Sequence, residues 1–503
     1  MELFNQEKTI FMDGGMGTML QARGLQAGQA PDLWNITHPQ EVEAVHRAYL
    51  EAGSQWISTN TFGTNAKKLA QTGESVSRVV TAAVACAKRA AQGYNAKILL
   101  DVGPLGTMLE PMGTLPFEEA YRLFQEVVCE GEKAGVDGVL FETMTDLYEV
   151  RAAVLAAKEN TSLPVWVSMS FESNGRPFCG TPVQAFALTA QGLGVDAVGI
   201  KCSLGPNEIL PMAKTLSEST DLPVFIKANA GLPDPSTGEY SLQAEEYAQQ
   251  MKAYLPLSLA AVGGCCGTTP DYIRALTQVF SDKKPEKASV VKKSFVCSGM
   301  NVVEIDGLTV IGERINPTGK PRMKEALRAH SMDFLMRQAV EQTEAGAQIL
   351  DVNVGLPGID EAEMMVKAVK AVQSVTELPL QLDSTKAEVL EAGLRVYNGK
   401  PIVNSVNAED KVLKEILPLC KKYGAAVVGL TLDESGIPNE AEKRFALAEK
   451  IVRTAEEYGI PREDVYIDCL TLTASAQQEA VWQTLLAVRM VKERLGVKTV
   501  LGV

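Results

Sequence analysis

Short apolar runs rich in valine, isoleucine and aromatic residues recur through the first half of the chain, roughly every 30 residues. The segments between them carry an apolar residue at every third or fourth position, as in residues 39–51, 117–134 and 240–253. This alternation predicts buried strands separated by amphipathic helices. The predicted strands lie at residues 9–13, 56–61, 97–102, 138–142, 165–171, 197–202, 223–228 and 259–263.

Eight strand–helix units in about 250 residues are what a (β/α)8 barrel of the TIM type requires. Parallel strands need crossovers of this length, and right-handed crossovers place each helix outside the sheet. A doubly wound open sheet is the alternative, but the number of units favours a closed barrel.

A charged segment with a proline, residues 281–293, interrupts the pattern and is typical of a linker. Helical segments at 332–345 and 441–458 then separate a second series of strands. These strands are predicted at residues 309–316, 349–353, 379–383, 402–406, 426–432, 465–468 and 498–503. We therefore expect two tandem α/β barrels, residues 1–285 and 301–503, joined by a linker at 286–300. Only seven strands fit into the second barrel, so we expect it to be truncated before its last strand.

Composition narrows the class of protein. The formal net charge is −14, which argues against a nucleic-acid or anionic-membrane surface. No apolar run reaches the ~18 residues of a membrane span, and the first residues lack the pattern of a signal peptide. Nine cysteines without paired spacing favour a reduced, cytoplasmic protein. With only three histidines, a histidine-based metal site is nearly excluded.

In such barrels the active site lies at the carboxyl ends of the strands. Cys202 ends the sixth predicted strand, and Cys265 and Cys266 end the eighth. Three thiols at one rim in a reducing cell favour a metal over a disulfide, and zinc is the metal that thiolates bind most typically. A redox pair of adjacent cysteines is the alternative. We expect the other cysteines to be ordinary core residues, because cysteine is among the most buried residue types. They are Cys86, Cys129, Cys179, Cys297, Cys420 and Cys469.

A zinc ion on three thiolates keeps one position open, and a substrate thiol bound there loses its proton. If the substrate is an amino acid, its carboxylate suits the amides of a glycine loop that precedes a helix. That loop contains Gly14, Gly15, Gly17 and Thr18. The substrate ammonium would lie near Asp13 and Glu142, although both acids could equally be helix N-caps. Asn229 is a candidate for the fourth metal position in the empty site.

Five motifs carry a family resemblance: Asp-Gly-Gly-Met-Gly-Thr, Thr-Asn-Thr-Phe, Phe-Glu-Thr, Lys-Cys-Ser and Gly-Gly-Cys-Cys-Gly. In this order they resemble the homocysteine-binding barrel of cobalamin-dependent methionine synthases, a module shared with betaine- and S-methylmethionine-dependent methyltransferases. The resemblance covers residues 5–280. It implies that Cys202, Cys265 and Cys266 bind zinc, and that Asp13, Glu142 and the glycine loop hold homocysteine.

Polar residues also end the strands of the second half, where about half of the acids are expected to cap helices. They are Glu313, Asn316, Asp351, Asn353, Asp383, Asn404, Asp433 and Asp468. Carboxylates and amides together suit a heterocycle with N–H and C=O edges.

This half resembles the pterin-binding family in Ile311-Gly-Glu-Arg-Ile-Asn-Pro-Thr-Gly319, Leu350-Asp-Val-Asn-Val-Gly355, Leu382-Asp-Ser-Thr385 and Val403-Asn-Ser405. The resemblance implies that Asp383, Asn404 and Asp468 contact the pterin, with Asn316 nearby. In that family a further Asn follows the seventh strand, so we expect the folate site here to be incomplete.

These resemblances imply that one barrel activates homocysteine on zinc and the other presents methyltetrahydrofolate. Methylcobalamin, carried by a domain or protein outside this sequence, would pass the methyl group between them to give methionine. The alternatives are a cobalamin-independent methyltransferase that uses a sulfonium or betaine donor, a less favoured dihydropteroate synthase, and an inactive zinc- and folate-binding fragment.

Overall fold

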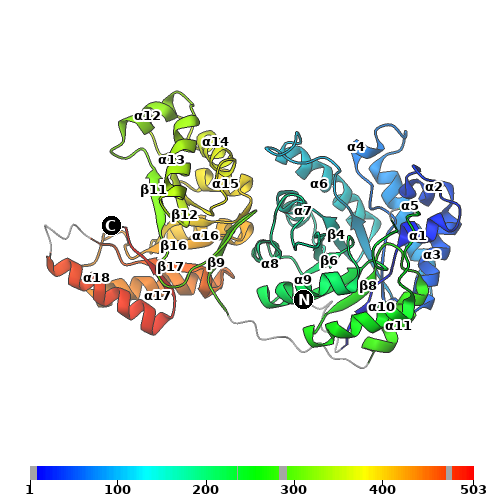
Figure 1. The fold of residues 1–503 in the computed structure, drawn as a ribbon. Coiled ribbons are helices and arrows are strands. Elements are labelled where there is room, and N and C mark those ends of the chain that lie inside the picture. The colour runs from blue at the N-terminus through cyan, green and yellow to red at the C-terminus, as the bar shows by residue number, and fades with distance from the viewer. Residues whose placement is uncertain (1–7, 235, 282–291, 472–477, 503) are drawn as a thin grey trace. The chain divides into compact units, whose positions relative to one another are not determined.

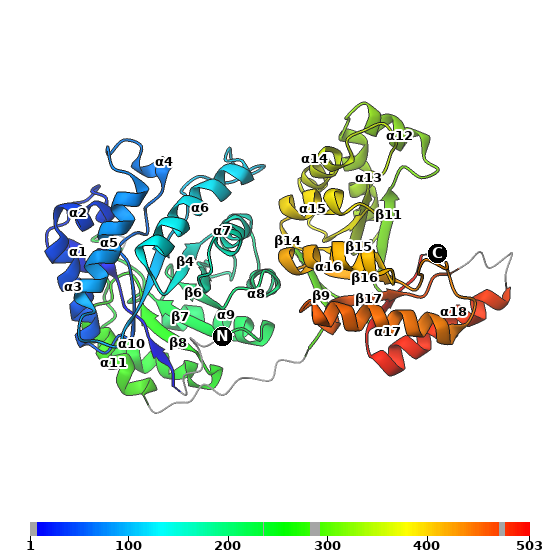
Figure 2. The ribbon, with the colours of Figure 1, turned by 180° about the vertical axis from the view of Figure 1, so that it is seen from behind.

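The computed structural model describes residues 8–234, 236–281, 292–471 and 478–502 (Figures 1 and 2). The chain forms two compact units, the first ending at Val290 and the second beginning at Val291. Most of the predicted linker, residues 282–291, lies outside the described residues. None of the helices in the described ranges is long and apolar enough to cross a membrane.

The first unit is a closed parallel barrel, as predicted. Its strands are β1 (Ile10–Phe11), β2 (Trp56–Ser58), β3 (Lys97–Val102), β4 (Gly138–Met144), β5 (Val165–Met169), β6 (Ala197–Lys201), β7 (Val224–Ala228) and β8 (Ala261–Gly264). From β2 to β8 each strand pairs in parallel with the next, and β1 pairs in parallel with β8. A parallel bridge between Met12 and Trp56 closes the ring between β1 and β2. Every strand of the barrel therefore has neighbours on both sides.

Helices surround this barrel (Figure 1). They are α1 (Met16–Gln21), α2 (Trp34–Thr37), α3 (Pro39–Glu51), α4 (Ala66–Leu69), α5 (Val76–Ala90), α6 (Phe117–Ala134), α7 (Leu147–Asn160), α8 (Val183–Gly192), α9 (Pro206–Ser219), α10 (Ala244–Met251) and α11 (Pro270–Phe280). The predicted helices at 39–51 and 117–134 are confirmed. The third, at 240–253, is shorter than expected because residues 240–243 belong to the loop before α10.

The interior of the barrel has two layers. Side chains from all eight strands fill the lower layer, which is apolar. Trp166 stacks on Trp56 at 4.5 Å between ring centroids and lies 5.4 Å from Phe225. Two residues further along β2, β3, β4, β5 and β7, and four residues further along β6, the inward side chains are polar, because side chains alternate between the faces of a strand. This polar layer contains Ser58, Asp101, Glu142, Ser168, Lys201 and Lys227. The apolar layer fills the lower part of the barrel, so a ligand inside the described barrel has to lie above the polar layer.

The second unit is a seven-stranded parallel sheet of the same strand–helix type, as predicted. Its strands, in spatial order, are β11 (Ile311–Ile315), β12 (Ile349–Asn353), β13 (Leu380–Asp383), β15 (Ile402–Asn407), β16 (Ala426–Leu430), β17 (Val465–Asp468) and β18 (Lys498–Val500). The helices are α12 (Pro321–Arg328), α13 (Asp333–Glu344), α14 (Glu361–Gln373), α15 (Ala387–Val396), α16 (Asp410–Tyr423), α17 (Ala441–Glu457) and α18 (Gln478–Met490).

A small antiparallel sheet in this unit was not predicted. It joins β10 (Val302–Glu304), β9 (Phe295–Ser298) and β14 (Gly399–Lys400). The end of the expected linker at 286–300 is thus a strand. Its strands have two to four residues, too few to show a period of two in the sequence. Val296 and Val303 nevertheless pack into the core beside Ile349 and Tyr466, so this sheet belongs to the body of the second unit.

Candidate functional site

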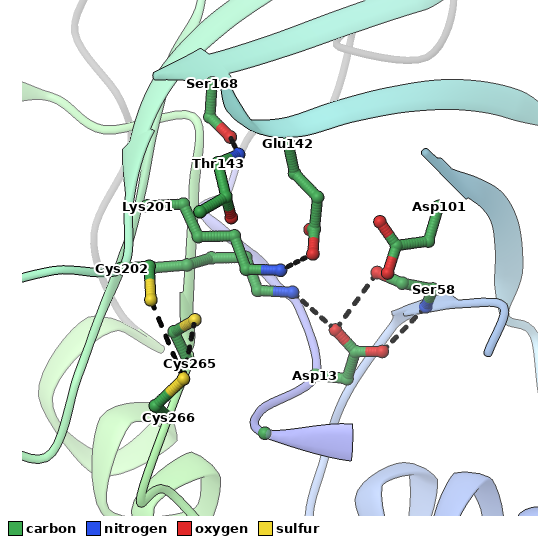
Figure 3. A network of polar contacts seen from close by, with 12 residues as sticks. Asp13, Ser58, Asp101, Glu142, Thr143, Ser168, Lys201, Cys202, Cys265 and Cys266 are labelled. Atoms are coloured by element: carbon green, nitrogen blue, oxygen red, sulfur yellow. Dashed lines mark hydrogen bonds and ion pairs between the residues drawn. The ribbon is translucent and has the colours of Figure 1, made fainter. Parts of the chain in front are cut away.

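A cavity of about 300 Å³ lies above the polar layer of the first barrel. The glycine loop after β1 forms one side, and the turns after β6 and β8 form another. Figure 3 shows the charged side chains between them. The cavity is large enough for a small amino acid, and it lies at the carboxyl ends of the strands, where the sequence predicted a site.

The three predicted cysteines converge at this cavity. The sulfur atoms of Cys202, Cys265 and Cys266 all lie within 4.8 Å of one another. The Cys202 and Cys266 sulfurs are 3.6 Å apart, and those of Cys265 and Cys266 are 3.9 Å apart. The other six cysteines lie outside the cluster, and five of them are buried as expected, with Cys129 half-buried.

Backbone geometry aims these sulfurs at one another. Cys202 and Ser203 have left-handed backbones, with φ of 70° and 60°. Such conformations cost roughly 1–3 kcal/mol in residues other than glycine, and they collect at functional sites. The N–H of Cys202 donates to Lys227 O at 3.1 Å, and that of Cys265 donates to Ala228 O at 2.9 Å. Strand β7 therefore holds both thiol turns, although it carries no cysteine.

The sulfur cluster has the donor chemistry of a thiolate metal site. The hydrogen bond with Cys202 and burial together raise the pKa of the Cys265 thiol to about 11. Without a cation, the thiols therefore stay protonated at neutral pH. Soft sulfur donors at this spacing fit zinc, which thiolates bind as the deprotonated ligand.

Asn229 holds the turn that carries Cys266. Its side-chain oxygen Oδ1 accepts a hydrogen bond from the Cys266 N–H at 3.1 Å, and its side chain is buried. Its expected position as a fourth metal ligand stays a prediction. In the structure Asn229 contributes to the site by fixing a cysteine.

Two of the loop glycines are required by close packing. A Cβ atom on Gly14 would lie 2.7 Å from Thr268 Oγ1, and one on Gly15 would lie 2.6 Å from Cys265 O. A Cβ atom on Gly17 would meet no atom within 4 Å, so close packing does not require this glycine. Thr18 Oγ1 accepts the Gly267 N–H at 3.0 Å, which ties the loop to the cysteine turn.

The two predicted carboxylates are each paired with a buried lysine (Figure 3). Asp13 accepts hydrogen bonds from Lys227 Nζ at 2.6 Å, from the Ser58 N–H at 2.7 Å and from Ser58 Oγ at 3.3 Å. Glu142 forms an ion pair with Lys201. Sequence reasoning missed both lysines, although a lysine at the end of an apolar strand, as in Val224–Ala228, was a signal for them.

Asp101 is a third acid of the polar layer that sequence reasoning missed. It lies at the end of β3, is 7% exposed and lines the cavity. Its Oδ1 has no hydrogen-bond partner among the described residues. Burial raises the pKa of Asp101 to about 7.

The second unit gathers acids and amides at the ends of β12, β13 and β15. Asn353 Nδ2 donates to Asp383 Oδ2 at 2.9 Å. Gln381 and Asn404 donate to Asp351 Oδ1 at 2.6 and 3.4 Å. Burial and the charge of Asp383 raise the pKa of Asp351 to about 7. Of the residues predicted to bind folate, Asp383 and Asn404 thus lie in one cluster, with Asp351 and Gln381 as further members.

The remaining predicted folate residues have local partners. Asn316 Oδ1 accepts the Thr318 N–H at 2.9 Å, and Asp468 Oδ1 accepts the Leu470 N–H at 2.7 Å. Glu313 forms an ion pair with Lys320 at 3.2 Å on the surface. These three side chains are not hydrogen-bonded to the cluster in the described part of the chain.

Comparison with known proteins divides the chain in the same way. Residues 10–280 match the family described as homocysteine S-methyltransferase, and residues 312–503 match the family described as pterin binding enzyme. The methionine synthases of Mycobacterium leprae and Mycobacterium tuberculosis are each 31% identical over 99% of this chain. The chain spans only 44% of the length of either relative.

Solved structures resemble one unit each. The homocysteine methyltransferase MmuM from Escherichia coli, in its metallated form, is 22% identical with a TM-score of 0.48; the match covers 55% of this chain and 98% of that one. A dihydropteroate synthase from Xanthomonas albilineans with 4-aminobenzoic acid is 19% identical with a TM-score of 0.34, over 42% of this chain and 77% of that one.

Proposed function

This chain belongs to the homocysteine S-methyltransferase family, and we propose that its first unit transfers a methyl group to the thiol of homocysteine, giving methionine. The observation that carries this proposal is the cluster of three sulfur atoms within 4.8 Å at one end of a cavity sized for an amino acid.

Cys202, Cys265 and Cys266 would hold a zinc ion through their sulfur atoms. A zinc ion bound there would supply the positive charge that keeps the substrate sulfur deprotonated, and therefore nucleophilic, at neutral pH. The backbone bonds from β7 and the amide of Asn229 keep the three sulfurs in place. Lys201, which precedes Cys202 in the chain, adds positive charge beside the thiolates.

The rest of the cavity would bind the amino-acid end of homocysteine. The loop with Gly14, Gly15, Gly17 and Thr18 supports the carboxylate end, because its glycines let the backbone approach the cysteine turn closely. Asp13 and Glu142 line the same cavity and would form its acidic wall, each beside its lysine. The apolar layer below excludes water from that direction.

The second unit would present the methyl donor. We propose methyltetrahydrofolate, held by the cluster around Asp383 and Asn404, because its carboxylates and amides match the N–H and C=O edges of a pterin ring. Of the residues proposed with them, Glu313 lies in β11, Asn316 follows that strand, and Asp468 ends β17. A methyltransferase that uses a sulfonium or betaine donor directly needs no such unit. We infer that methylcobalamin, carried by a domain or protein outside this chain, links the two sites.

Metal analysis combined with a methylation assay tests the first unit. The full chain should bind about one zinc ion and convert homocysteine to methionine with free methylcobalamin as donor. Cys202→Ala should lose both properties, because two remaining thiolates make an incomplete site. Cys129→Ala, on the outer helix α6, is the matched control and should keep both. Zinc content near that of the wild type in Cys202→Ala would contradict the proposed ligand set.

A further inference from the structure

Among the described residues, Asp101 is the one acid at the cavity whose carboxyl group has no partner. Four acids line the cavity: Asp13, Asp32, Asp101 and Glu142. Asp13 and Glu142 are balanced by Lys227 and Lys201. Asp32 Oδ1 accepts hydrogen bonds from the Gly63 N–H at 2.9 Å and from Thr64 Oγ1 at 2.8 Å, which hold the loop after β2. In the described part of the chain, the Asp101 carboxyl makes no hydrogen bond or ion pair.

A buried carboxylate without a partner is unfavourable unless a ligand supplies a hydrogen bond or a positive charge. A charged group loses several kcal/mol of hydration on burial, and a hydrogen-bonded cation offsets that loss. Lys201 and Lys227 lie close enough to favour the ionised form of Asp101, but burial, which is the largest cause, and the charges of Asp13 and Asp32 raise its pKa. The site therefore lacks one cation.

Glu142 supplies a second acceptor on the neighbouring strand. Its Oε1 is used by Lys201, whereas its Oε2 is buried without a hydrogen-bond partner among the described residues. Strands β3 and β4 run in parallel with Asp101 opposite Leu140, so Glu142 follows two residues further along the same inward face. In Figure 3 the Glu142 carboxyl lies beside the end of the Lys201 side chain, and the Asp101 carboxyl lies beside Ser58, above Asp13.

We propose that Asp101, together with the free oxygen of Glu142, receives the α-ammonium group of the substrate and thereby selects an amino-acid thiol over a thiol acid without an amino group. An ammonium group has three hydrogen-bond donors and one positive charge. It would therefore supply both the donors and the positive charge that these two carboxylate oxygens need. Asp13 then acts as a positioning residue that holds Lys227 and strand β2. The inference rests on the proposed function, because it assigns a residue to recognition of the same substrate.

The test compares L-homocysteine with 4-mercaptobutyrate, which is homocysteine without its amino group. Calorimetry on the zinc-loaded full chain gives the affinity for each thiol, and methylation by free methylcobalamin gives kcat/KM for each. In Asp101→Asn, affinity and kcat/KM for homocysteine should fall about 10- to 100-fold, the usual effect of losing a buried charge-assisted hydrogen bond. The values for 4-mercaptobutyrate should change less than about twofold.

Two control variants make the result specific. Asp137→Asn removes an acid from an exposed ion pair with Lys97 at the start of β4, at the opposite end of the barrel, and should leave the preference unchanged. The double variant Asp13→Asn/Lys227→Met removes one buried pair of the cavity with no change in net charge; its overall activity should fall, but its ratio of affinities should still favour homocysteine over 4-mercaptobutyrate. Asp101→Asn itself is nearly isosteric and removes an unpaired charge, so thermal melting should show a folded protein.

Each outcome decides one claim. If Asp101→Asn keeps the wild-type preference, Asp101 does not bind the ammonium group and the inference is wrong. If the double variant alone loses the preference, the ammonium site is at Asp13. If the wild type methylates neither thiol, the proposed function fails, and the calorimetric preference still tests Asp101 separately.

Discussion

At the mouth of the first barrel acids lie against lysines, whereas in the second unit they lie against amides. Asp13 and Glu142 each contact a buried ammonium group, but Asp383 and Asp351 contact the side chains of Asn353, Gln381 and Asn404. The strand–helix architecture is the same in both. An ionic wall suits a charged amino acid, and a carboxylate–amide wall suits a neutral ring with N–H donors. The difference shows that this architecture fixes where a site lies and leaves its chemistry to the last residues of each strand.

The largest expected effect comes from breaking a buried ion pair. Lys227→Met leaves the Asp13 carboxylate without its cation at 4% side-chain exposure, and should lower the free energy of unfolding by about 3–5 kcal/mol. Adding Asp13→Asn should restore most of that loss, because no buried charge then remains unpaired.

Differential scanning calorimetry of the full chain measures how breaking a buried ion pair changes the melting transition of each unit. Lys400→Met is the matched variant, because Lys400 pairs with buried Asp464 at 2.7 Å in the second unit. Each variant should lower the melting transition of its own unit. A melting curve of Lys227→Met that coincides with the wild-type curve would show that the first pair does not stabilise the fold.

A smaller effect depends on pH. His46 is fully buried in the first unit, neither ring nitrogen has a partner among the described residues, and burial lowers its pKa to about 4. The unfolded chain therefore binds the proton more tightly. Neutral His46 makes its full contribution to the free energy of unfolding above pH 6.5, and this contribution is lost as the pH falls toward 4. Between pH 7 and 5 the wild type should lose about 2 kcal/mol relative to His46→Phe.

Urea unfolding at several pH values measures this difference. The control is His330→Gln, because the histidine of the second unit is exposed, and its curves should run parallel to those of the wild type. Equal slopes for the wild type and His46→Phe would mean that His46 keeps an ordinary pKa in the folded protein.

The smallest effect separates the two sites. Asp383→Asn removes a charge from the second cluster and should weaken methyltetrahydrofolate binding about tenfold, the range of one charge-assisted hydrogen bond. Homocysteine methylation from free methylcobalamin should persist in this variant. Asp433→Asn is the control, since Asp433 only caps the Ser435 turn on the surface. Loss of homocysteine methylation in Asp383→Asn would show that the sites are not independent.

Much of the fold follows from local patterns. The apolar runs predicted all eight strands of the first barrel and seven of the second unit, because each buried strand alternates with a helix of clear period. The three-stranded sheet around β9 was missed, because strands of two to four residues leave no such pattern. The cysteine cluster was predictable from a rule about strand ends, since Cys202 and Cys265 follow strands of one barrel.

The charge balance of the site was not predictable in the same way. Lys227 and Asp13 are 214 residues apart, and only the closed ring and its register bring Nζ to 2.6 Å from the carboxylate. Asp101 is similar: in the sequence it is one acid in a strand, and its lack of a cation becomes visible only when the neighbouring lysines are already paired. Asn229 was placed correctly at the rim, but its hydrogen bond to the Cys266 N–H depends on backbone geometry.

The contacts that build the site also set the order in which it can form during synthesis. Gly15 donates its N–H to Thr268 Oγ1 across 253 residues, and Thr18 meets Gly267 across 249. A ribosome must therefore release the whole first barrel before its glycine loop can contact the cysteine turn, and until then strand β7 alone holds the two thiol turns. Uptake of the proposed metal is therefore expected to be a late, post-translational event of the finished barrel, well after Cys202 has left the ribosome.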